Sequence, residues 1–137
     1  MEADKCQQEC DGAYLIGTTL NLTSFYEKVP SNVFLTASTV KKKSVGFKAS
    51  PTSICECIRQ IFELTADQRI STLHMPILGS GRGGLPIHTA LLLQLISIKH
   101  YFTLFPHIKI VNIIVLEKDA KEIPDYIKNL QYVILPL

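Results

Sequence analysis

The clearest chemical signal in this 137-residue chain is a glycine-rich segment at residues 78–86. Four glycines stand within the six positions from Gly79 to Gly84, and Arg82 is the charged residue among them. Glycine permits positive φ angles and lets a ligand approach the backbone closely. Successive backbone amides in such a loop form a concave site for anions, and an arginine binds phosphate or carboxylate through two hydrogen bonds. The segment therefore predicts an anion-binding loop.

Two regular elements are needed to hold this loop. Residues 72–77 are rich in strand-forming side chains, and a strongly apolar segment from Pro86 to about residue 102 is a predicted helix. The amino end of a helix carries a partial positive charge that favours phosphate. Ligands of open α/β sheets bind beyond the carboxyl ends of the strands. The loop lies at such a position, between the end of a strand and the start of a helix.

Familiar phosphate loops match the segment only in part. A Walker loop has a lysine followed by serine or threonine after its last glycine, whereas Leu85 and Pro86 stand here. The glycine spacing of dinucleotide-binding loops is present, but it lies mid-chain and no clear acidic residue follows the next strand. The alternative is a structural turn that binds nothing. We favour a ligand because four glycines and an arginine exceed what a turn requires.

The rest of the chain alternates between predicted strands and helices. A helix begins at Pro51, with Ser53 and Glu56 as a capping box, and residues 39–49 are expected to form an exposed loop. The run at 109–116 is apolar enough to predict a central strand buried on both faces. Further elements are expected at residues 14–17, 32–38 and 132–135 (strands) and 123–129 (a short helix). This order predicts an α/β fold with helices on both faces of the sheet.

The composition fits one cytoplasmic domain. Hydrophobic residues make up 47% of the chain, which excludes a wholly disordered protein. A net charge of +2 is too small to predict nucleic acid as a partner. No apolar stretch reaches the roughly 20 residues of a membrane span, so we expect a membrane contact only through segments that this chain does not contain. We assign residues 1–11 to an N-terminal tail and residues 12–137 to the domain.

The cysteines and histidines do not predict a metal site or a catalytic site. Cys55 and Cys57 are two positions apart on a predicted helix, so their thiols point in nearly opposite directions. Cys6 and Cys10 have a spacing that suits zinc, but no second pair of ligands accompanies them. The four histidines are scattered, and His88 alone falls near the glycine loop. We therefore expect no metal and no catalytic residue.

Residues 75–84, Met-Pro-Ile-Leu-Gly-Ser-Gly-Arg-Gly-Gly, resemble the strand and phosphate loop of macro domains, which bind ADP-ribose and its relatives. Within that superfamily the chain is most similar to the nucleotide sensor of Thoeris anti-phage effectors. In that sensor a proline-containing strand, a Gly-Ser/Thr-Gly-Arg loop and a leucine-rich helix precede a lysine-rich segment and an apolar strand, the order found over residues 76–116. Residues 15–19 and 34–38 look like two earlier strands. The resemblance implies a three-layer α/β/α macro-domain fold with a mixed central sheet.

The resemblance also implies a ligand site for a derivative of ADP-ribose, assembled from several parts of the chain. The loop amides and Arg82 would hold the diphosphate, and hydroxyls near residue 38 would contact a ribose. Phe47 borders the expected crevice and can stack on a base or imidazole, and a carboxylate after the apolar strand can accept from adenine or ribose. The ligand-binding set that we expect is Gly17, Thr18, Thr19, Ser38, Thr39, Phe47, Leu78, Gly79, Ser80, Gly81, Arg82, Gly83, Gly84, Leu85 and Glu117.

One departure from the family pattern bears on activity. Hydrolytic macro domains carry an Asn-Ala-Asn segment after an early strand, and the corresponding position here falls near residues 36–39, Thr-Ala-Ser-Thr. We therefore expect the ligand to be bound and not consumed, without a cofactor. In Thoeris systems the resemblance implies a sensor for a signal made by a TIR-domain enzyme, an ADP-ribose conjugate that carries histidine in one branch. Whether the sensor forms a homo-oligomer is left open. The alternatives are an ADP-ribosyl hydrolase with an atypical catalytic set and a protein-interaction module.

Overall fold

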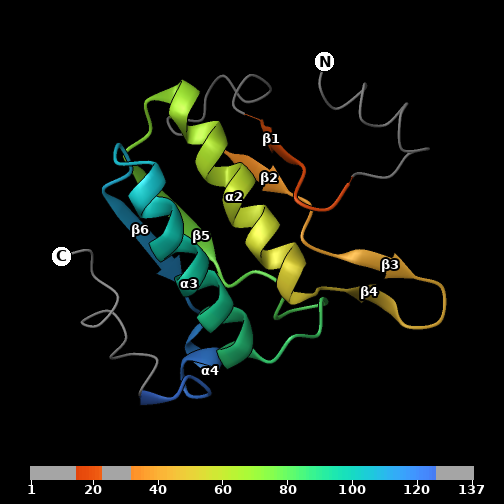
Figure 1. Ribbon diagram of the computed structural model, residues 1–137. Coiled ribbons are helices and arrows are strands. Elements are labelled where there is room, and N and C mark those ends of the chain that lie inside the picture. The colour runs from red at the N-terminus through yellow and green to blue at the C-terminus, as the bar shows by residue number, and fades with distance from the viewer. Residues whose placement is uncertain (1–14, 23–31, 126–137) are drawn as a thin grey trace.

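A computed structural model describes residues 15–22 and 32–125 (Figure 1). The expected N-terminal tail at 1–11, the expected strand at 132–135 and most of the expected helix at 123–129 lie outside these residues. In chain order the elements are β1 (Thr19–Asn21), β2 (Phe34–Thr36), β3 (Val40–Lys42), β4 (Gly46–Lys48), α2 (Pro51–Gln68), β5 (Thr72–Pro76), α3 (Ile87–Leu104), β6 (Ile110–Ile114) and α4 (Glu117–Ala120).

The described strands form three pairs that mix both directions. β5 and β6 are parallel, and their register places Thr72 opposite Ile110 and Pro76 opposite Ile114. β1 and β2 are antiparallel, and β3 and β4 form an antiparallel hairpin. A parallel pair needs a crossover connection, which α3 supplies between β5 and β6. The α/β class expected from the alternation of elements is therefore confirmed.

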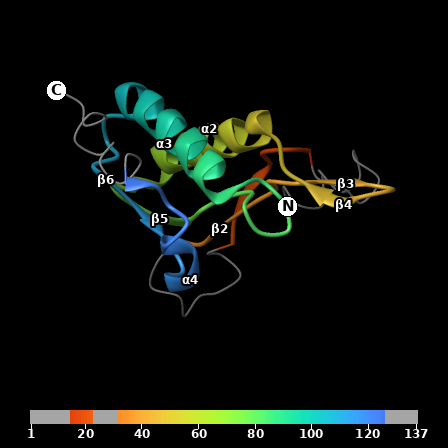
Figure 2. The ribbon, with the colours of Figure 1, turned by 90° about the horizontal axis from the view of Figure 1, so that it is seen from below.

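Both long helices lie on the same face of the β5–β6 pair (Figure 2). Burial alternates along β5, so that Leu73 and Met75 are buried while Thr72, His74 and Pro76 are exposed. Successive strand residues point to opposite faces, and the buried set therefore faces the helices. Phe62 of α2 lies at the centre of this core, with the rings of Tyr101 and Phe102 at centroid distances of 5.8 and 6.0 Å. This packing fixes the direction in which β5 leads into the glycine-rich loop.

The start of α2 confirms the expected helix but not its capping residues. The helix begins at Pro51, as expected, and Ser50 is its N-cap. The Ser50 hydroxyl accepts from the backbone of Ser53, and the Ser53 hydroxyl accepts from the backbone of Ser50, which completes a capping box. Glu56 takes no part in it and instead accepts a hydrogen bond from Arg59. The predicted box was displaced by three residues, because Ser50 is the N-cap and Ser53 occupies the third helical position, where glutamate or glutamine is usual.

The expected loop at residues 39–49 is a hairpin instead. The turn between β3 and β4 is closed by a hydrogen bond from the amide of Val45 to the carbonyl of Lys42, and Gly46 takes a positive φ of 75°. Each strand has only three residues, all of them exposed, so no alternation of buried and exposed side chains could reveal it. The hairpin projects beside the start of α2 (Figure 1).

Two other strand predictions need correction. The apolar run at 109–116 is not buried on both faces, because Ile110 and Ile114 of β6 are 52% and 58% exposed. A largely apolar run cannot show what covers its second face, and both long helices lie on the other side of the β5–β6 pair. The first strand was expected at residues 14–17. Tyr14 lies outside the described residues, Ile16 and Gly17 form a turn, and β1 begins only at Thr19.

Candidate functional site

The glycine-rich loop connects β5 to α3 and closes on itself. The amide of Leu85 donates to the carbonyl of Gly79 at 3.0 Å, and the amide of Gly84 donates to the carbonyl of Gly81 at 3.1 Å. Gly79 and Gly84 have φ angles of 81° and 74°, which side chains other than glycine's adopt with strain. The loop is thus a compact turn whose central residues project from the fold.

The glycines of this loop have different roles. A Cβ atom at Gly79 would stand 2.7 Å from the Ile54 side chain, and one at Gly83 would stand 2.6 Å from the Gly79 carbonyl oxygen. Packing is therefore a sufficient reason for glycine at these two positions. A Cβ atom at Gly81, in contrast, would meet nothing within 4 Å. The exposed side of the loop at Gly81 and Arg82 is open for a ligand.

A buried glutamine holds the base of the loop. Gln94 of α3 is completely buried, and its side-chain oxygen accepts from the amide of Leu78 at 3.0 Å. Its side-chain nitrogen donates to the carbonyl of Pro76 at 2.9 Å. The Gln94 side chain therefore satisfies two backbone groups at the end of β5, the Pro76 carbonyl and the Leu78 amide, that would otherwise lack a hydrogen-bond partner. Sequence analysis missed this residue, and its signal was a single amide side chain within an apolar helix.

A lysine from the hairpin stands over the other end of the loop. The amide of Ala49 donates to the carbonyl of Gly83 at 3.0 Å, which ties the hairpin to the loop. The preceding residue, Lys48, brings its Nζ atom to 3.1 Å from where a Cβ atom at Gly84 would stand. The loop therefore has two cations beside it, Lys48 and its own Arg82. Lys48 was not among the expected site residues, because residues 39–49 were predicted to be a solvated loop.

The amino end of α3 follows the loop directly. Its N-cap is Pro86, which makes no side-chain capping hydrogen bond. The first-turn amides of an uncapped helix remain free to bind solvent or an anion, and the helix dipole favours negative charge there. His88 is exposed in this first turn. The amino end of α3 therefore adds to the positive potential at the loop.

The expected wall at residues 17–19 is built into the β1–β2 pair. Gly17 is buried, its amide donates to the carbonyl of Ala37 at 2.9 Å, and a Cβ atom there would stand 2.4 Å from the Glu56 side chain. The carbonyl of Thr18 accepts from the amide of Ala37, and the Thr19 hydroxyl donates to the carbonyl of Gly17. This wall and the glycine loop both pack against the first turns of α2, through Glu56 and Ile54 respectively.

The remaining expected residues surround this arrangement without a described contact to the loop. Ser38 and Thr39 are half-buried between β2 and β3. Phe47 is 46% exposed and, as the neighbour of Lys48 on β4, points to the opposite face of the hairpin. Glu117 is exposed at the start of α4. The structure therefore brings residues 78–85 together with the end of the hairpin, and the ligand-binding roles of all the expected residues stay predictions.

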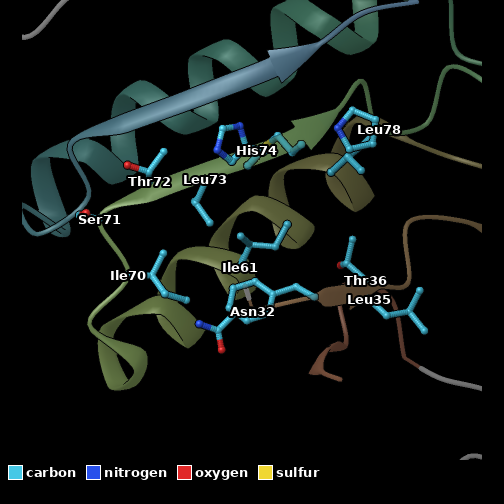
Figure 3. A pocket seen from close by; sticks show the side chains of 13 residues that line it. Asn32, Leu35, Thr36, Ile61, Ile70, Ser71, Thr72, Leu73, His74 and Leu78 are labelled. Carbon is cyan, nitrogen blue, oxygen red and sulfur yellow. The ribbon is translucent and has the colours of Figure 1, made fainter. Parts of the chain in front are cut away.

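A cavity lies away from the loop, between β2 and β5 (Figure 3). It has a volume of about 730 Å³, and Ile61 of α2 is among its lining residues. Phe34 to Thr36 line one side and Thr72 to Pro76 the other, and Leu78 is the only expected site residue on its wall. Both strands already pair on their other edge, and no strand among residues 15–22 and 32–125 lies between them. The cavity is the space between two open strand edges.

The described residues contain neither a metal cluster nor a membrane span. No group of three or more histidine, cysteine or acidic side chains in residues 15–22 and 32–125 is placed to hold a metal ion. None of the helices that the structure describes is long and apolar enough to cross a membrane.

Burial raises the pKa of the Cys57 thiol, so this buried cysteine is neutral and unreactive.

Comparison with known proteins gives one family and one fold. The family model described as "Macro domain" matches residues 2–93. The macro domain of ganglioside induced differentiation associated protein 2 superposes with a TM-score of 0.68 at 18% identity, over 99% of this chain and 65% of that one. An Oceanobacillus iheyensis macrodomain with ADP gives 0.66 at 21% identity, over 96% and 66%. A mutant of that macrodomain with ADPR gives 0.68 at 22% identity, over 97% and 71%.

The match in length is partial. This chain spans about two thirds of the macro domain chains that it resembles, while nearly all of this chain is included in each superposition. At these levels of identity the superpositions show the fold. No curated protein sequence matches the chain.

Proposed function

Because this chain belongs to the macro domain family, we propose that it binds a nucleotide derived from ADP-ribose at the glycine-rich loop. The observation that carries this proposal is the open side of the loop at Gly81, in a loop that carries Arg82, has Lys48 over Gly84 and leads into the uncapped start of α3. Two of the matched macrodomain structures hold ADP and ADPR, which supports a nucleotide diphosphate as the ligand.

The loop and its cations suit the two phosphates. The free amides of the loop donate to phosphate oxygens, and Arg82 adds a planar guanidinium that binds phosphate in a bidentate manner. Lys48 supplies a second, compact positive charge over Gly84. No aspartate or glutamate occurs anywhere in residues 68–116, so the loop and both elements that flank it carry no acidic residue. An anion at this place is therefore attracted by every charged side chain of that stretch.

We further propose that the ligand is bound and not consumed. Residues 36–39 offer hydroxyl groups in place of the Asn-Ala-Asn amides, and the Thr36 hydroxyl already pairs with that of Thr19 at 2.9 Å. The nearby Cys57 thiol is buried and neutral, which makes it a poor nucleophile. The resemblance of residues 75–84 to Thoeris sensors supports a cytoplasmic sensor of a TIR-derived signal, such as a histidine conjugate of ADP-ribose, in anti-phage defence. In such a sensor the bound ligand would change how copies of the chain assemble.

The experiment is a calorimetric titration of the purified domain with ADP-ribose and with its histidine conjugate. Both ligands are recovered afterwards and identified by mass spectrometry. We expect binding of at least one of them and recovery of both intact. Release of free ADP-ribose from the conjugate would favour the alternative, an ADP-ribosyl hydrolase with an atypical catalytic set. No heat from either ligand would refute the nucleotide site.

A variant locates the binding in the loop. Gly81→Glu places a carboxylate where the phosphates would lie, and the space around Gly81 accepts a side chain without a clash. We expect this variant to lose affinity more than tenfold while its circular dichroism spectrum stays that of the parent. The matched control is Ser44→Glu, which makes the same change of charge in the turn of the hairpin and should bind almost as the parent does.

A further inference from the structure

The β3–β4 hairpin is anchored to the glycine-rich loop at its base. The hydrogen bond from the amide of Ala49 to the carbonyl of Gly83 lies directly beside Lys48, the last residue of β4. The Nζ atom of Lys48 lies over Gly84, which shows that this face of β4 looks toward the loop. The hairpin therefore presents one of its two faces to the side of the proposed ligand.

The register of the hairpin sorts its lysines between the two faces. Lys48 pairs with Val40, and Lys41 pairs with Phe47. Paired residues share a face and neighbouring residues do not, so Lys42 lies on the face of Lys48 while Lys41 lies on the opposite face. Lys42 is then the diagonal neighbour of Lys48, at about 7–8 Å between their Cα atoms. A row of positive charge runs from the loop through Lys48 to Lys42.

No acidic residue is close to these lysines in the sequence. Residues 32–55 contain no aspartate or glutamate, and the same is true of residues 68–116. Arg59 forms ion pairs with Glu56 and Glu63 on α2, whereas the lysines of the hairpin form none with the residues that the structure describes. The lysines of the hairpin are exposed and remain available to an anion that lies along its face.

We propose that Lys42 forms a second anion-binding site beside the loop. This site would bind a phosphate ester on a ribose hydroxyl of the bound nucleotide. This inference rests on the proposed function, because the diphosphate in the loop is what places the ribose beside the hairpin. A ribose phosphate lies one sugar away from the diphosphate, which suits a second cation one diagonal step from Lys48. The site then prefers ADP-ribose 2′-phosphate to ADP-ribose.

The test compares these two ligands by calorimetry at low ionic strength, where exposed charges are least screened. We expect the parent domain to bind ADP-ribose 2′-phosphate about fivefold more tightly, as one exposed charge pair of about 1 kcal/mol allows. Lys42→Gln should remove this preference and leave the affinity for ADP-ribose unchanged. Lys41→Gln is the matched control, because it removes the same charge from the adjacent residue on the opposite face, and it should keep the preference.

The outcomes separate the two proposals. Equal affinity of the parent for both ligands would refute the second anion-binding site at Lys42 and would not affect the proposed site at the loop. An equal loss of preference in Lys41→Gln and Lys42→Gln would also overturn it, since general attraction to a positive hairpin would then be the cause. Binding of neither ligand by the parent would refute the nucleotide site at the loop, and with it the second anion-binding site at Lys42. Circular dichroism of each variant shows that it is folded.

Discussion

At the scale of single residues, the glycines of the loop have two different roles: some are required by packing, and one leaves the backbone accessible to a ligand. Gly79 and Gly83 are glycines because neighbouring atoms leave no room for a Cβ atom. Gly81 has that room, and its backbone is exposed. A structural turn needs only the first kind of position, and an anion site needs both. The loop therefore combines a rigid frame with an accessible backbone.

Alanine substitutions should separate these two roles. In Gly83→Ala the new Cβ atom would lie 2.6 Å from the carbonyl oxygen of Gly79 and 2.8 Å from the Ala49 side chain, so the loop must shift. We expect a loss of about 1–3 kcal/mol in the free energy of unfolding, the usual cost of overpacking. Gly81→Ala is the control and should change stability by less than about 0.5 kcal/mol. Urea denaturation measures both, and equal stability of the two variants would contradict this division.

Single residues also mark the limit of sequence analysis at this site. The glycines and Arg82 were predictable because their types and spacing are unusual. Lys48 and Gln94 were not, because their roles come from tertiary contacts with Gly84, Leu78 and Pro76 that no spacing encodes. A lysine in a polar segment usually points into solvent, and a glutamine in an apolar helix has no signature of its partner.

At the scale of elements, the order of β5, loop and α3 could be predicted from the sequence, as could the start of α2. Each has a strong local signal, such as proline at the first helical position or an apolar run that ends in glycines. The hairpin of β3 and β4 could not be predicted, because strands of three exposed residues have no buried face. The exposed face of β6 was missed because hydropathy does not say which neighbours cover a strand.

The open edge of β5 gives an element-scale prediction. The carbonyl of Ser71 accepts from the amide of Lys109, so the alternation along a strand directs the amides of Leu73 and Met75 toward β6. The amides of Thr72 and His74 then point to the cavity beside β2. We expect these two amides to exchange with solvent at least tenfold faster than those of Leu73 and Met75, as measured by NMR.

The comparison is internal to one strand, so differences in global stability do not affect it. Equal protection of all four amides would contradict an open edge and would mean that a further strand pairs with β5 in solution.

At the scale of the whole molecule, the described fold has two candidate ligand sites with different chemistry, a cavity and an exposed loop. The cavity between β2 and β5 is lined mostly by apolar side chains, and no lysine or arginine lines it. The glycine-rich loop has Arg82, Lys48 and the uncapped start of α3. An anionic nucleotide should therefore bind at the loop and not in the cavity (Figure 3).

The most direct test of that claim follows the backbone amide signals of the ¹⁵N-labelled domain while ADP-ribose is added. The account predicts that the largest chemical-shift changes fall on residues 79–85, on Lys48 and Ala49, and on the first turn of α3. The amides of Leu35, Thr72 and Leu73, which line the cavity, should change little. Changes centred on the cavity residues, or no changes at all, would contradict the assignment of the glycine-rich loop as the nucleotide site.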